Sequence, residues 1–266
     1  MDQIAFLGAG SMAAAMVEGL VGNGAYSPDR ISCIGGSGAS AQRLSERTGI
    51  RLARSLDELL AKADTLVVAF KPQHLGSADP SLSALTDGRL VISVLAGKKV
   101  DALARAYPKA RNIVRSMPNT PSQIGAGVTG WCARAPLHPG DRRILDAVFG
   151  SLGVSLELPE SQIDAFTAIC GCGPAYVFEF AAALRDAGLS LGFEPATAKL
   201  FAVETLLGAA RLLARRDVDP EVLRSEVTSP NGVTSAGLRT MADFDFRGMI
   251  RKTVAAAKTR AEELSA

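Results

Sequence analysis

Short apolar runs alternate with helical patterns along the first half of the chain. The apolar runs lie at 3–7, 31–34, 65–70, 90–95 and 112–115, and the helical patterns follow the first run as far as residue 20 and then lie at 39–48, 55–63 and 98–106. Strands that alternate with helices predict a parallel β-sheet. The runs at 66–70 and 90–95 are apolar almost throughout, as in strands covered on both faces. Two weaker strands, 127–132 and 154–158, flank a helix at 140–152 and are predicted to complete the sheet.

After Pro159 no further strand pattern occurs and helical periodicity continues to the end. Helices are predicted at 160–169, 174–191, 195–215, 219–227, 233–243 and 246–264, with breaks at glycine and proline positions such as Gly173-Pro174. The fold class is therefore α/β, with a parallel-sheet domain over 1–159 and an all-helical domain over 160–266. The helix from 174 is apolar nearly all round and needs cover on several sides. Because about 107 residues are few for enclosing it, we expect a second subunit to cover it.

Composition excludes several classes of protein. The 266 residues are 47% hydrophobic and 21% charged, which is typical of a folded globular chain. A net charge of +2 without a basic run argues against nucleic acid as the principal ligand. Two histidines, four cysteines and the lack of a metal-binding motif predict no metal site. No apolar run approaches the roughly 20 residues of a membrane span, and no secretory segment precedes the first strand, so we expect no membrane partner and a cytoplasmic location.

The first strand-to-helix junction carries a dinucleotide fingerprint. The residues Gly8-Ala9-Gly10-Ser11-Met12-Ala13 fit the pattern Gly-x-Gly-x-x-Ala. Gly8 permits a tight turn, Gly10 lets a pyrophosphate approach the backbone, and Ala13 lets the helix pack on the strand. The phosphate would rest on the helix N-terminus, where free N–H groups and the dipole favour an anion. The pattern is weak alone, but its place at the first junction predicts a Rossmann-type domain.

The end of the second strand bears on the choice of cofactor. NAD-binding proteins usually place an acidic residue about 20 positions after the glycines, where it holds the ribose 2′-hydroxyl. Here the turn Gly35-Gly36-Ser37 carries no acid, so a 2′-phosphate would meet backbone N–H groups and the Ser37 hydroxyl without repulsion. This favours NADPH, while a turn that is merely flexible would admit NADH as well.

Three further segments are unusual for connectors: Phe70-Lys71-Pro72, Met117-Pro118-Asn119-Thr120-Pro121 and Ser229-Pro230-Asn231-Gly232-Val233-Thr234. The first two follow strands and therefore lie at the carboxyl edge of the sheet, where ligands bind. Asn119 is a candidate ligand, whereas Lys71 and Arg115 are either ligands or solvated surface cations. The third segment joins two helices and predicts either an anion site at a helix start or an ordinary turn that Thr234 caps.

Together these motifs resemble the pyrroline-5-carboxylate reductases. The resemblance runs from end to end and rests on Gly8–Ala13, Phe70-Lys71-Pro72, Ala96-Gly97, Met117–Pro121, Gly173-Pro174-Ala175-Tyr176 and Val227–Thr234. It implies reduction of the cyclic imine 1-pyrroline-5-carboxylate to L-proline by NAD(P)H, the final step of proline biosynthesis. It also implies that the helical domain forms a homodimer and that, in some members, dimers build a larger ring such as a pentamer of dimers.

The resemblance implies roles for individual residues as well. With the turn Gly35-Gly36-Ser37, the predicted cofactor site comprises Gly8, Ala9, Gly10, Ser11, Met12, Ala13, Phe70, Lys71, Pro72, Ala96, Gly97 and Asn119. The predicted substrate site comprises Ser229, Asn231, Gly232, Val233 and Thr234. Backbone N–H groups would take the carboxylate, and the Thr234 hydroxyl would lie near the imine nitrogen as the catalytic group.

The chain departs from the family pattern at three positions. Asn231 stands where glycine is usual, and Cys170 and Cys172 stand where serine is usual. Asparagine still tolerates a left-handed backbone, but its side chain could alter the carboxylate pocket. The two cysteines are interpreted as small packing residues rather than nucleophiles, because no histidine lies near them in the sequence.

The scarcity of histidine agrees with imine chemistry. A protonated imine already carries positive charge, so hydride attack needs placement against the nicotinamide rather than a metal or a strong acid. A related 3-hydroxy acid dehydrogenase would need a Lys or His base where the second domain starts, and residues 174–180 contain neither. The alternatives that stay open are such a relative, a reductase of another cyclic imino acid, and a non-catalytic NADP-binding homologue.

Overall fold

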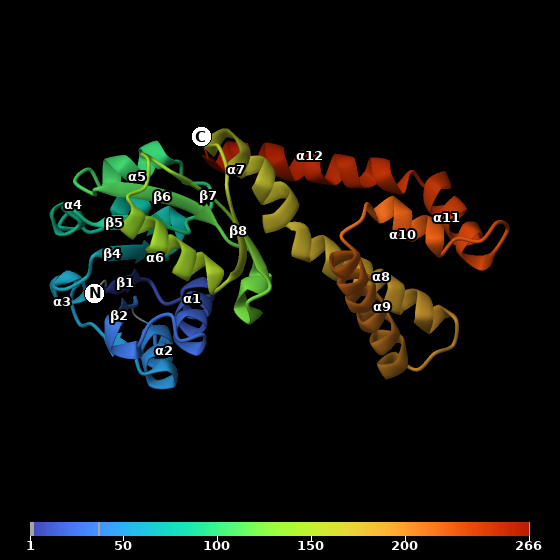
Figure 1. Ribbon diagram of the computed structural model, residues 1–266, viewed down its shortest axis with the longest axis horizontal. Helices are drawn as coiled ribbons and strands as arrows, with labels where there is room; N and C mark the ends of the chain where they lie inside the picture. The colour runs from blue at the N-terminus through green and yellow to red at the C-terminus, as the bar shows by residue number, and fades with distance from the viewer. Residues whose placement is uncertain (1–2, 37, 266) are drawn as a thin grey trace. The chain divides into compact units, whose positions relative to one another are not determined.

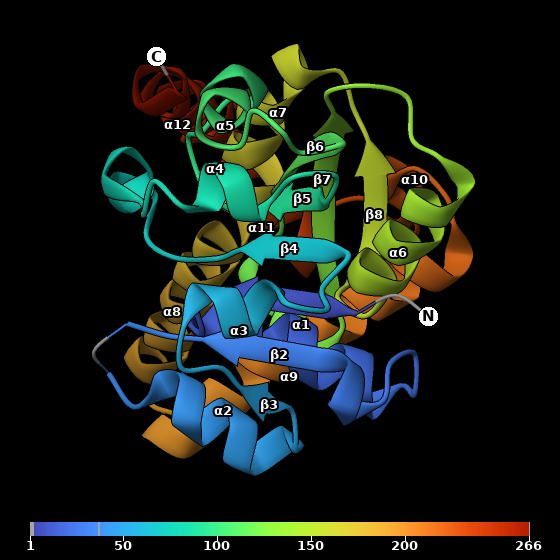
Figure 2. The ribbon, with the colours of Figure 1, turned by 90° about the vertical axis from the view of Figure 1, so that its left-hand side faces the viewer.

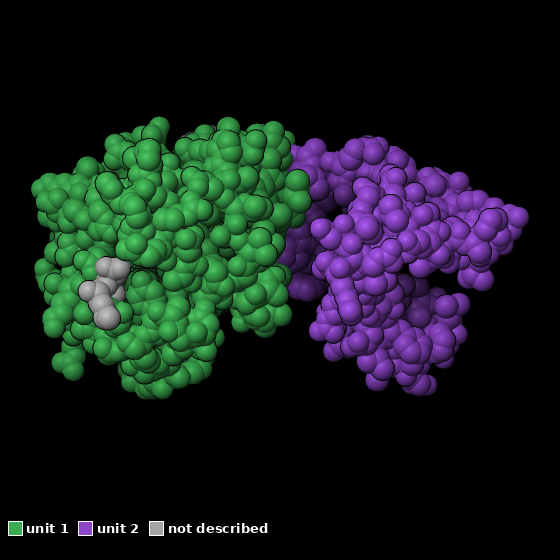
Figure 3. Space-filling model, viewed as in Figure 1, with its two compact units in different colours: residues 1–172, 257–266 green, residues 173–256 purple. Residues whose placement is uncertain are grey.

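The computed structural model describes residues 3–36 and 38–265. Packing divides the chain into two compact units (Figure 3). The first unit contains the residues up to Cys172 together with those from Ala257 onward, and the second contains Gly173–Ala256.

The described part of the first unit is built on an eight-stranded sheet. Its strands are β1 (Ile4–Leu7), β2 (Ile31–Ile34), β3 (Arg51–Leu52), β4 (Thr65–Val68), β5 (Leu90–Ser93), β6 (Asn112–Met117), β7 (Gly127–Ala133) and β8 (Gly153–Glu157). They lie in the order β3-β2-β1-β4-β5-β6-β7-β8, visible in part in Figure 2. The sheet is parallel as predicted, except that β7 runs antiparallel to β6. Residues 118–126 are too few for the crossover of about a dozen residues that a parallel pair needs.

Helices cover both faces of this sheet. The helices are α1 (Ser11–Gly22), α2 (Ser40–Thr48), α3 (Leu56–Leu60), α4 (Leu82–Leu85), α5 (Val100–Ala106) and α6 (Pro139–Gly150), with 3-10 turns η1 (Pro28–Arg30), η2 (Pro72–Ser77) and η3 (Thr120–Ile124). Buried side chains of α1, α2 and α6 pack with Ile4 and Phe6, whereas those of α3, α4 and α5 pack with Ala5. Successive residues of β1 thus enter opposite cores, which is the two-residue period of a strand.

The rest of the chain is helical (Figure 1). Its elements are α7 (Glu160–Phe166), the π-helical turn η4 (Thr167–Gly171), α8 (Gly173–Ser190), α9 (Pro195–Arg216), α10 (Pro220–Glu226), α11 (Val233–Asp243) and α12 (Phe246–Ser265). The predicted break at Gly173-Pro174 is confirmed, because the chain bends at Cys172 and α8 begins at Gly173. Pro174 therefore lies in the first turn of α8, where proline is tolerated because an N–H there has no partner within the helix.

Two sequence-based expectations about this region change. By length and composition alone, the run Glu160–Ser190 could cross a membrane, so the statement that no apolar run approaches that length does not hold. One such helix is weak support for a membrane span. The predicted boundary after residue 159 also differs from the division by packing, because Ile163 of α7 is buried beside Val100 and Cys132 of the first unit.

The second unit leaves much apolar surface uncovered. No residue of α8 is buried in the single chain. An apolar groove of about 850 Å³ is lined mainly by α8, α11 and α12, including Val177, Phe180, Met241 and Met249. A helix this apolar and this exposed agrees with the expectation that a second subunit covers it.

Candidate active site

The glycine loop lies at the carboxyl end of β1, where the strand order reverses between β1 and β4. Gly8 has φ +109° and donates its N–H to the Ile34 carbonyl at 2.9 Å. A Cβ on Gly8 would lie 2.6 Å from the carbonyl carbon of Ala69, so the loops after β1 and β4 touch here. Any side chain at Gly8 would be strained and obstructed. The switch point of an open α/β sheet is also where ligands bind.

Gly10 immediately precedes α1 and leaves the N-terminus of that helix open. Its backbone is extended, no side chain caps the helix, and no acidic residue lies in the first turn. Apart from Gly10 itself and its chain neighbours, no described atom lies within 4 Å of the place that a Cβ on Gly10 would take. The first N–H groups of an uncapped helix need acceptors, and the dipole favours an anion. This geometry fits the pyrophosphate of a dinucleotide.

Two other members of the fingerprint serve packing with their side chains. Ala9 and Ala13 are buried in the core under α1, whereas Ser11 is exposed and Met12 is half-buried. A cofactor would therefore meet Ala9 and Ala13 through the backbone.

The turn after β2 is glycine-rich and carries no acid in residues 35–40. A Cβ on Gly35 would lie 2.9 Å from the Ala41 Cβ, whereas one on Gly36 would lie in open space. Ser37 lies outside the described residues. The described part of the turn therefore offers space and no negative charge to a ribose 2′-substituent.

The loops after β4 and β5 are neighbours, because these strands pair directly. Phe70 is half-buried and Lys71 is exposed, and the Lys71 ammonium makes no ion pair among the described residues. Pro72 starts η2. Ala96 is exposed, and Gly97 has φ +68°. These predicted cofactor residues thus share the carboxyl edge of the sheet with Gly8–Ala13.

The side chain of Asn119 ties two segments together. Its Oδ1 accepts the N–H of Val128 at 2.9 Å, and its Nδ2 donates to the Cys170 carbonyl at 3.0 Å. In a regular helix that carbonyl would accept from Pro174, which has no N–H. Asn119 supplies the missing donor at the π turn. With both ends of the amide engaged, its predicted contact with a cofactor would have to use the backbone or the second amide hydrogen.

Arg115 is not a surface cation but a buried ion-pair partner, 3% exposed. Its guanidinium lies 2.6 Å from Asp164 Oδ1 and 3.2 Å from Glu160 Oε1. Glu160 Oε1 also accepts the Val100 N–H at 2.7 Å, and the Ser265 hydroxyl donates to Asp164 Oδ1 at 3.0 Å. This network was not predicted from the sequence. Its only sequence signal is the spacing of Glu160 and Asp164, which puts both acids on one helix face.

The predicted substrate segment joins α10 and α11 in the second unit. Asn231 has φ +57°, so it takes the left-handed conformation that the sequence analysis expected asparagine to tolerate. Gly232 precedes α11 as its N-cap, and no side chain caps the helix. A Cβ on Gly232 would overlap the Ser229 hydroxyl. Thr234 is therefore not the N-cap of α11, contrary to the alternative of a turn that Thr234 caps.

The start of α11 is open in the same way as the start of α1. Val233 is 93% exposed, Thr234 is exposed, and the first turn has no acidic residue. The Thr234 hydroxyl has no hydrogen-bond partner among the described residues. Uncapped N–H groups and a free hydroxyl suit an anionic ligand with an adjacent hydrogen-bond acceptor or donor.

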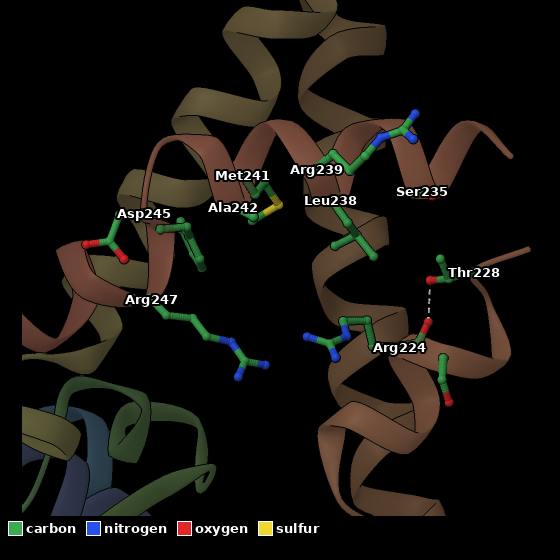
Figure 4. Close-up of a pocket in the computed structure, with 11 residues that line it drawn as sticks. Arg224, Thr228, Ser235, Leu238, Arg239, Met241, Ala242, Asp245 and Arg247 are labelled. Carbon is green, nitrogen blue, oxygen red and sulfur yellow. Dashed lines mark hydrogen bonds between the residues drawn. The ribbon is translucent and has the colours of Figure 1, made fainter. Parts of the chain in front are cut away.

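A cavity of about 760 Å³ lies beside this segment, between α10, α11 and the start of α12 (Figure 4). Its lining residues are Arg224, Ser225, Thr228, Ser235, Leu238, Arg239, Met241, Ala242, Asp245, Phe246 and Arg247. Arg224 and Arg247 point toward each other across it, and Arg247 pairs with Glu221 at 2.6 Å. None of the residues Ser229–Thr234 lines this cavity, so it is separate from the predicted carboxylate site.

The four cysteines are free. Burial raises the pKa of the Cys33 and Cys132 thiols to about 11, and it also raises the pKa of Cys170. A raised pKa keeps a thiol protonated and weakly nucleophilic at neutral pH. Among the residues that the structure describes, no group of three or more His, Cys, Asp or Glu side chains is placed to hold a metal ion.

Known proteins resemble this chain over its whole length. Residues 160–264 match the family described as pyrroline-5-carboxylate reductase dimerisation, and residues 3–97 match NADP oxidoreductase, coenzyme F420-dependent. The pyrroline-5-carboxylate reductase of Synechocystis is 34% identical, with 98% of both chains covered. Pyrroline-5-carboxylate reductase 2 of Bacillus subtilis is 33% identical over 99% of this chain and 95% of its own.

Solved structures agree with the sequence relatives. A pyrroline-5-carboxylate reductase from Coxiella burnetii has a TM-score of 0.93 at 33% identity, covering 100% of this chain and 99% of that one. The pyrroline carboxylate reductase of Plasmodium falciparum, solved with NADP bound, has a TM-score of 0.87 at 27% identity. The match covers 100% of this chain and 98% of that one.

Proposed function

This chain belongs to the pyrroline-5-carboxylate reductase family, and from that premise we propose how its residues carry out the reaction. The enzyme reduces the carbon–nitrogen double bond of 1-pyrroline-5-carboxylate to give L-proline, with NAD(P)H as the reductant. The observation that carries this conclusion is the match over the full length of both chains. This match gives no support to the alternatives, which were a reductase of another cyclic imino acid and a non-catalytic homologue.

The proposed cofactor site runs along the carboxyl ends of β1, β2, β4 and β5. The open N-terminus of α1, entered through Gly8 and Gly10, holds the pyrophosphate with backbone N–H groups. The loops Phe70–Pro72 and Ala96–Gly97 hold the remaining parts of the cofactor. When bound, the cofactor supplies the hydride, while the chain fixes its position and excludes water.

We propose that NADPH is preferred over NADH. The turn after β2 has no acid to hold a 2′-hydroxyl or to repel a 2′-phosphate, and space is open beside Gly36. The match of residues 3–97 to an NADP oxidoreductase family supports this preference.

The proposed substrate site is the Ser229–Thr234 segment. The uncapped backbone at Gly232 and Val233 holds the carboxylate, and the left-handed Asn231 shapes the turn that exposes these N–H groups. The Thr234 hydroxyl oxygen accepts the N–H of the protonated imine and holds the ring in place for attack. Ser229 supports the turn by accepting the Gly232 N–H on its carbonyl at 3.1 Å.

The chain assembles into an oligomer through its helical part, which matches a dimerisation family. We propose that the assembly is a homodimer, in which a second copy covers the apolar groove of α8, α11 and α12. A pentamer of dimers and a cytoplasmic location are further parts of the proposal. In functional terms the division proposed from the sequence is kept: residues 1–159 bind the cofactor, and residues 160–266 bind substrate and the second copy.

The test is an assay of purified protein with pyrroline-5-carboxylate and NADPH, and then with NADH, that follows the absorbance of the reduced cofactor. Oxidation that needs the imine and is faster with NADPH is expected. A second experiment uses Gly10→Val. The valine side chain would lie in open space, so the variant should fold, but it would block the approach of the pyrophosphate. Calorimetry should show that NADPH binding is lost. Turnover only with a six-membered imine, or NADPH binding without any turnover, would overturn the assignment.

A further inference from the structure

The C-terminal turn of α12 lies against the loop that follows β5. A Cβ on Gly97 would lie 2.9 Å from the backbone oxygen of Leu264 and 3.3 Å from its Cβ, so the two segments touch at Gly97. Figures 1 and 2 both draw the C-terminal end of α12 beside α5 and α7. All these residues belong to the first unit, because α12 re-enters it from Ala257 onward.

Ser265 anchors this turn to the buried ion-pair network. Its side chain is 6% exposed, and its hydroxyl donates to Asp164 Oδ1 at 3.0 Å. The same oxygen faces the buried guanidinium of Arg115 at 2.6 Å. A hydrogen bond to a charged, shielded acceptor is stronger than one between neutral exposed groups. The last turn of α12 is therefore held against Asp164.

The network also holds the other end of the Ala96–Lys99 loop. Lys99 is the N-cap of α5 and provides no side-chain cap for that helix. Instead, Glu160 Oε1 accepts the N–H of Val100 at 2.7 Å, and Glu160 pairs with Arg115. The loop is thus held at Val100 through Glu160 and at Gly97 through Leu264.

We propose that Leu264 and Ser265 are positioning residues that brace the Ala96–Lys99 loop for cofactor binding. The inference rests on the proposed placement of the cofactor beside Ala96 and Gly97. Without the brace the loop samples more conformations, and the bound cofactor has to order it at the expense of affinity. The expected effect is on the cofactor, because the braced loop belongs to the proposed cofactor site and the proposed substrate segment is Ser229–Thr234.

Ser265→Ala tests the brace, with Ser265→Thr as the conservative rescue and Glu263→Ala as the matched control. Glu263 lies in the same turn and makes only an exposed ion pair with Arg260. We expect Ser265→Ala to raise the Kd for NADPH roughly 3- to 10-fold and to leave the KM for the imine unchanged. Ser265→Thr should restore the wild-type Kd, and Glu263→Ala should not alter it.

A chain ending at residue 263 removes the brace entirely and should raise the Kd for NADPH beyond the value for Ser265→Ala. If that chain fails to fold, Ser265→Ala and its rescue decide the question alone. A lower melting temperature with an unchanged Kd would show a merely structural role and overturn the inference. Gly10→Val distinguishes failure of the brace from failure of the proposed cofactor site. If Gly10→Val loses NADPH binding while Ser265→Ala keeps the wild-type Kd, only the brace is rejected. If Gly10→Val binds NADPH like the wild type, the proposed cofactor site is rejected.

Discussion

Two glycines of one motif act by different physical means. Gly8 is required by the fold, because φ +109° and the contact with Ala69 leave no room for a side chain. Gly10 is required by the ligand, because its backbone is ordinary and its surroundings are open. The sequence pattern treats both as one signature. Only the tertiary structure distinguishes the glycine at which two loops touch from the glycine that leaves space for a phosphate.

At the residue scale, Thr234 offers the sharpest test of the proposed chemistry. Thr234→Ala removes a hydroxyl that has no partner among the described residues, so the fold should not suffer. Loss of one positioned hydrogen-bonding group should lower kcat/KM for the imine by about 10- to 1000-fold. Steady-state kinetics measure the loss, and calorimetry should give an unchanged Kd for NADPH.

Thr234→Ser is the matched control, since it keeps the hydroxyl and should keep most of the rate. An unaltered rate in Thr234→Ala would remove this hydroxyl from the mechanism.

At the element scale, the junction of α7 and α8 shows how one helix can follow another directly when the second begins with a proline in its first turn. Pro174 cannot donate to the Cys170 carbonyl and would crowd it. The chain responds with the π turn Thr167–Gly171, in which the Cys172 N–H donates to the Thr167 carbonyl at 2.8 Å. Asn119 then satisfies the free carbonyl of Cys170 from a loop of the sheet. Such π turns occur often at functional sites, and here the turn is bonded to the loop at the carboxyl end of β6.

Asn119→Ala should destabilise this junction. It leaves the Cys170 carbonyl and the Val128 N–H without their partners, which costs about 1–3 kcal/mol for each group left unsatisfied. Denaturant unfolding at fixed protein concentration measures the loss.

Asn119→Asp separates the two bonds, because a carboxylate still accepts from Val128 but cannot donate to Cys170. Its second carboxylate oxygen would face the Cys170 carbonyl oxygen, which it repels, so Asn119→Asp should also be less stable than the wild type. Equal stability of the wild type and the two variants would show that the hydrogen bonds of Asn119 contribute nothing to the free energy of unfolding.

At the scale of the whole molecule, the apolar groove of the second unit is the surface that assembly must cover. Val177 lines this groove and is 52% exposed in the single chain. Val177→Asp should therefore leave the single chain folded but place a charge in the interface. Burying an unpaired charge costs several kcal/mol, at the order of magnitude known for ions in protein interiors.

Analytical ultracentrifugation should show Val177→Asp shifted toward the monomer. Val154→Asp, at a 62% exposed position of β8 in the first unit, is the control and should sediment like the wild type. An unshifted Val177→Asp would place the interface elsewhere.

Most of the secondary structure and the glycine fingerprint could be predicted from the sequence, because both depend on residues close together in the chain. Alternating apolar runs predict the strands and helices within a few residues of their bounds, and the glycine fingerprint sits at the first junction as expected. The left-handed Asn231 follows from side-chain preference alone. β3 escaped prediction because two residues are too short to show a period.

The tertiary structure alone decided which distant groups meet. Arg115 could have been a solvated cation until its partners 45 and 49 residues away were known. Ser265 reaches Asp164 across 101 positions, and Leu264 reaches Gly97 across more. Backbone preference and hydrophobic period act over a few residues, whereas these contacts depend on how the sheet and the last helix pack. The cofactor motif could therefore be predicted from the sequence. Which side chains contact the loops around it could not, because those contacts depend on the tertiary packing.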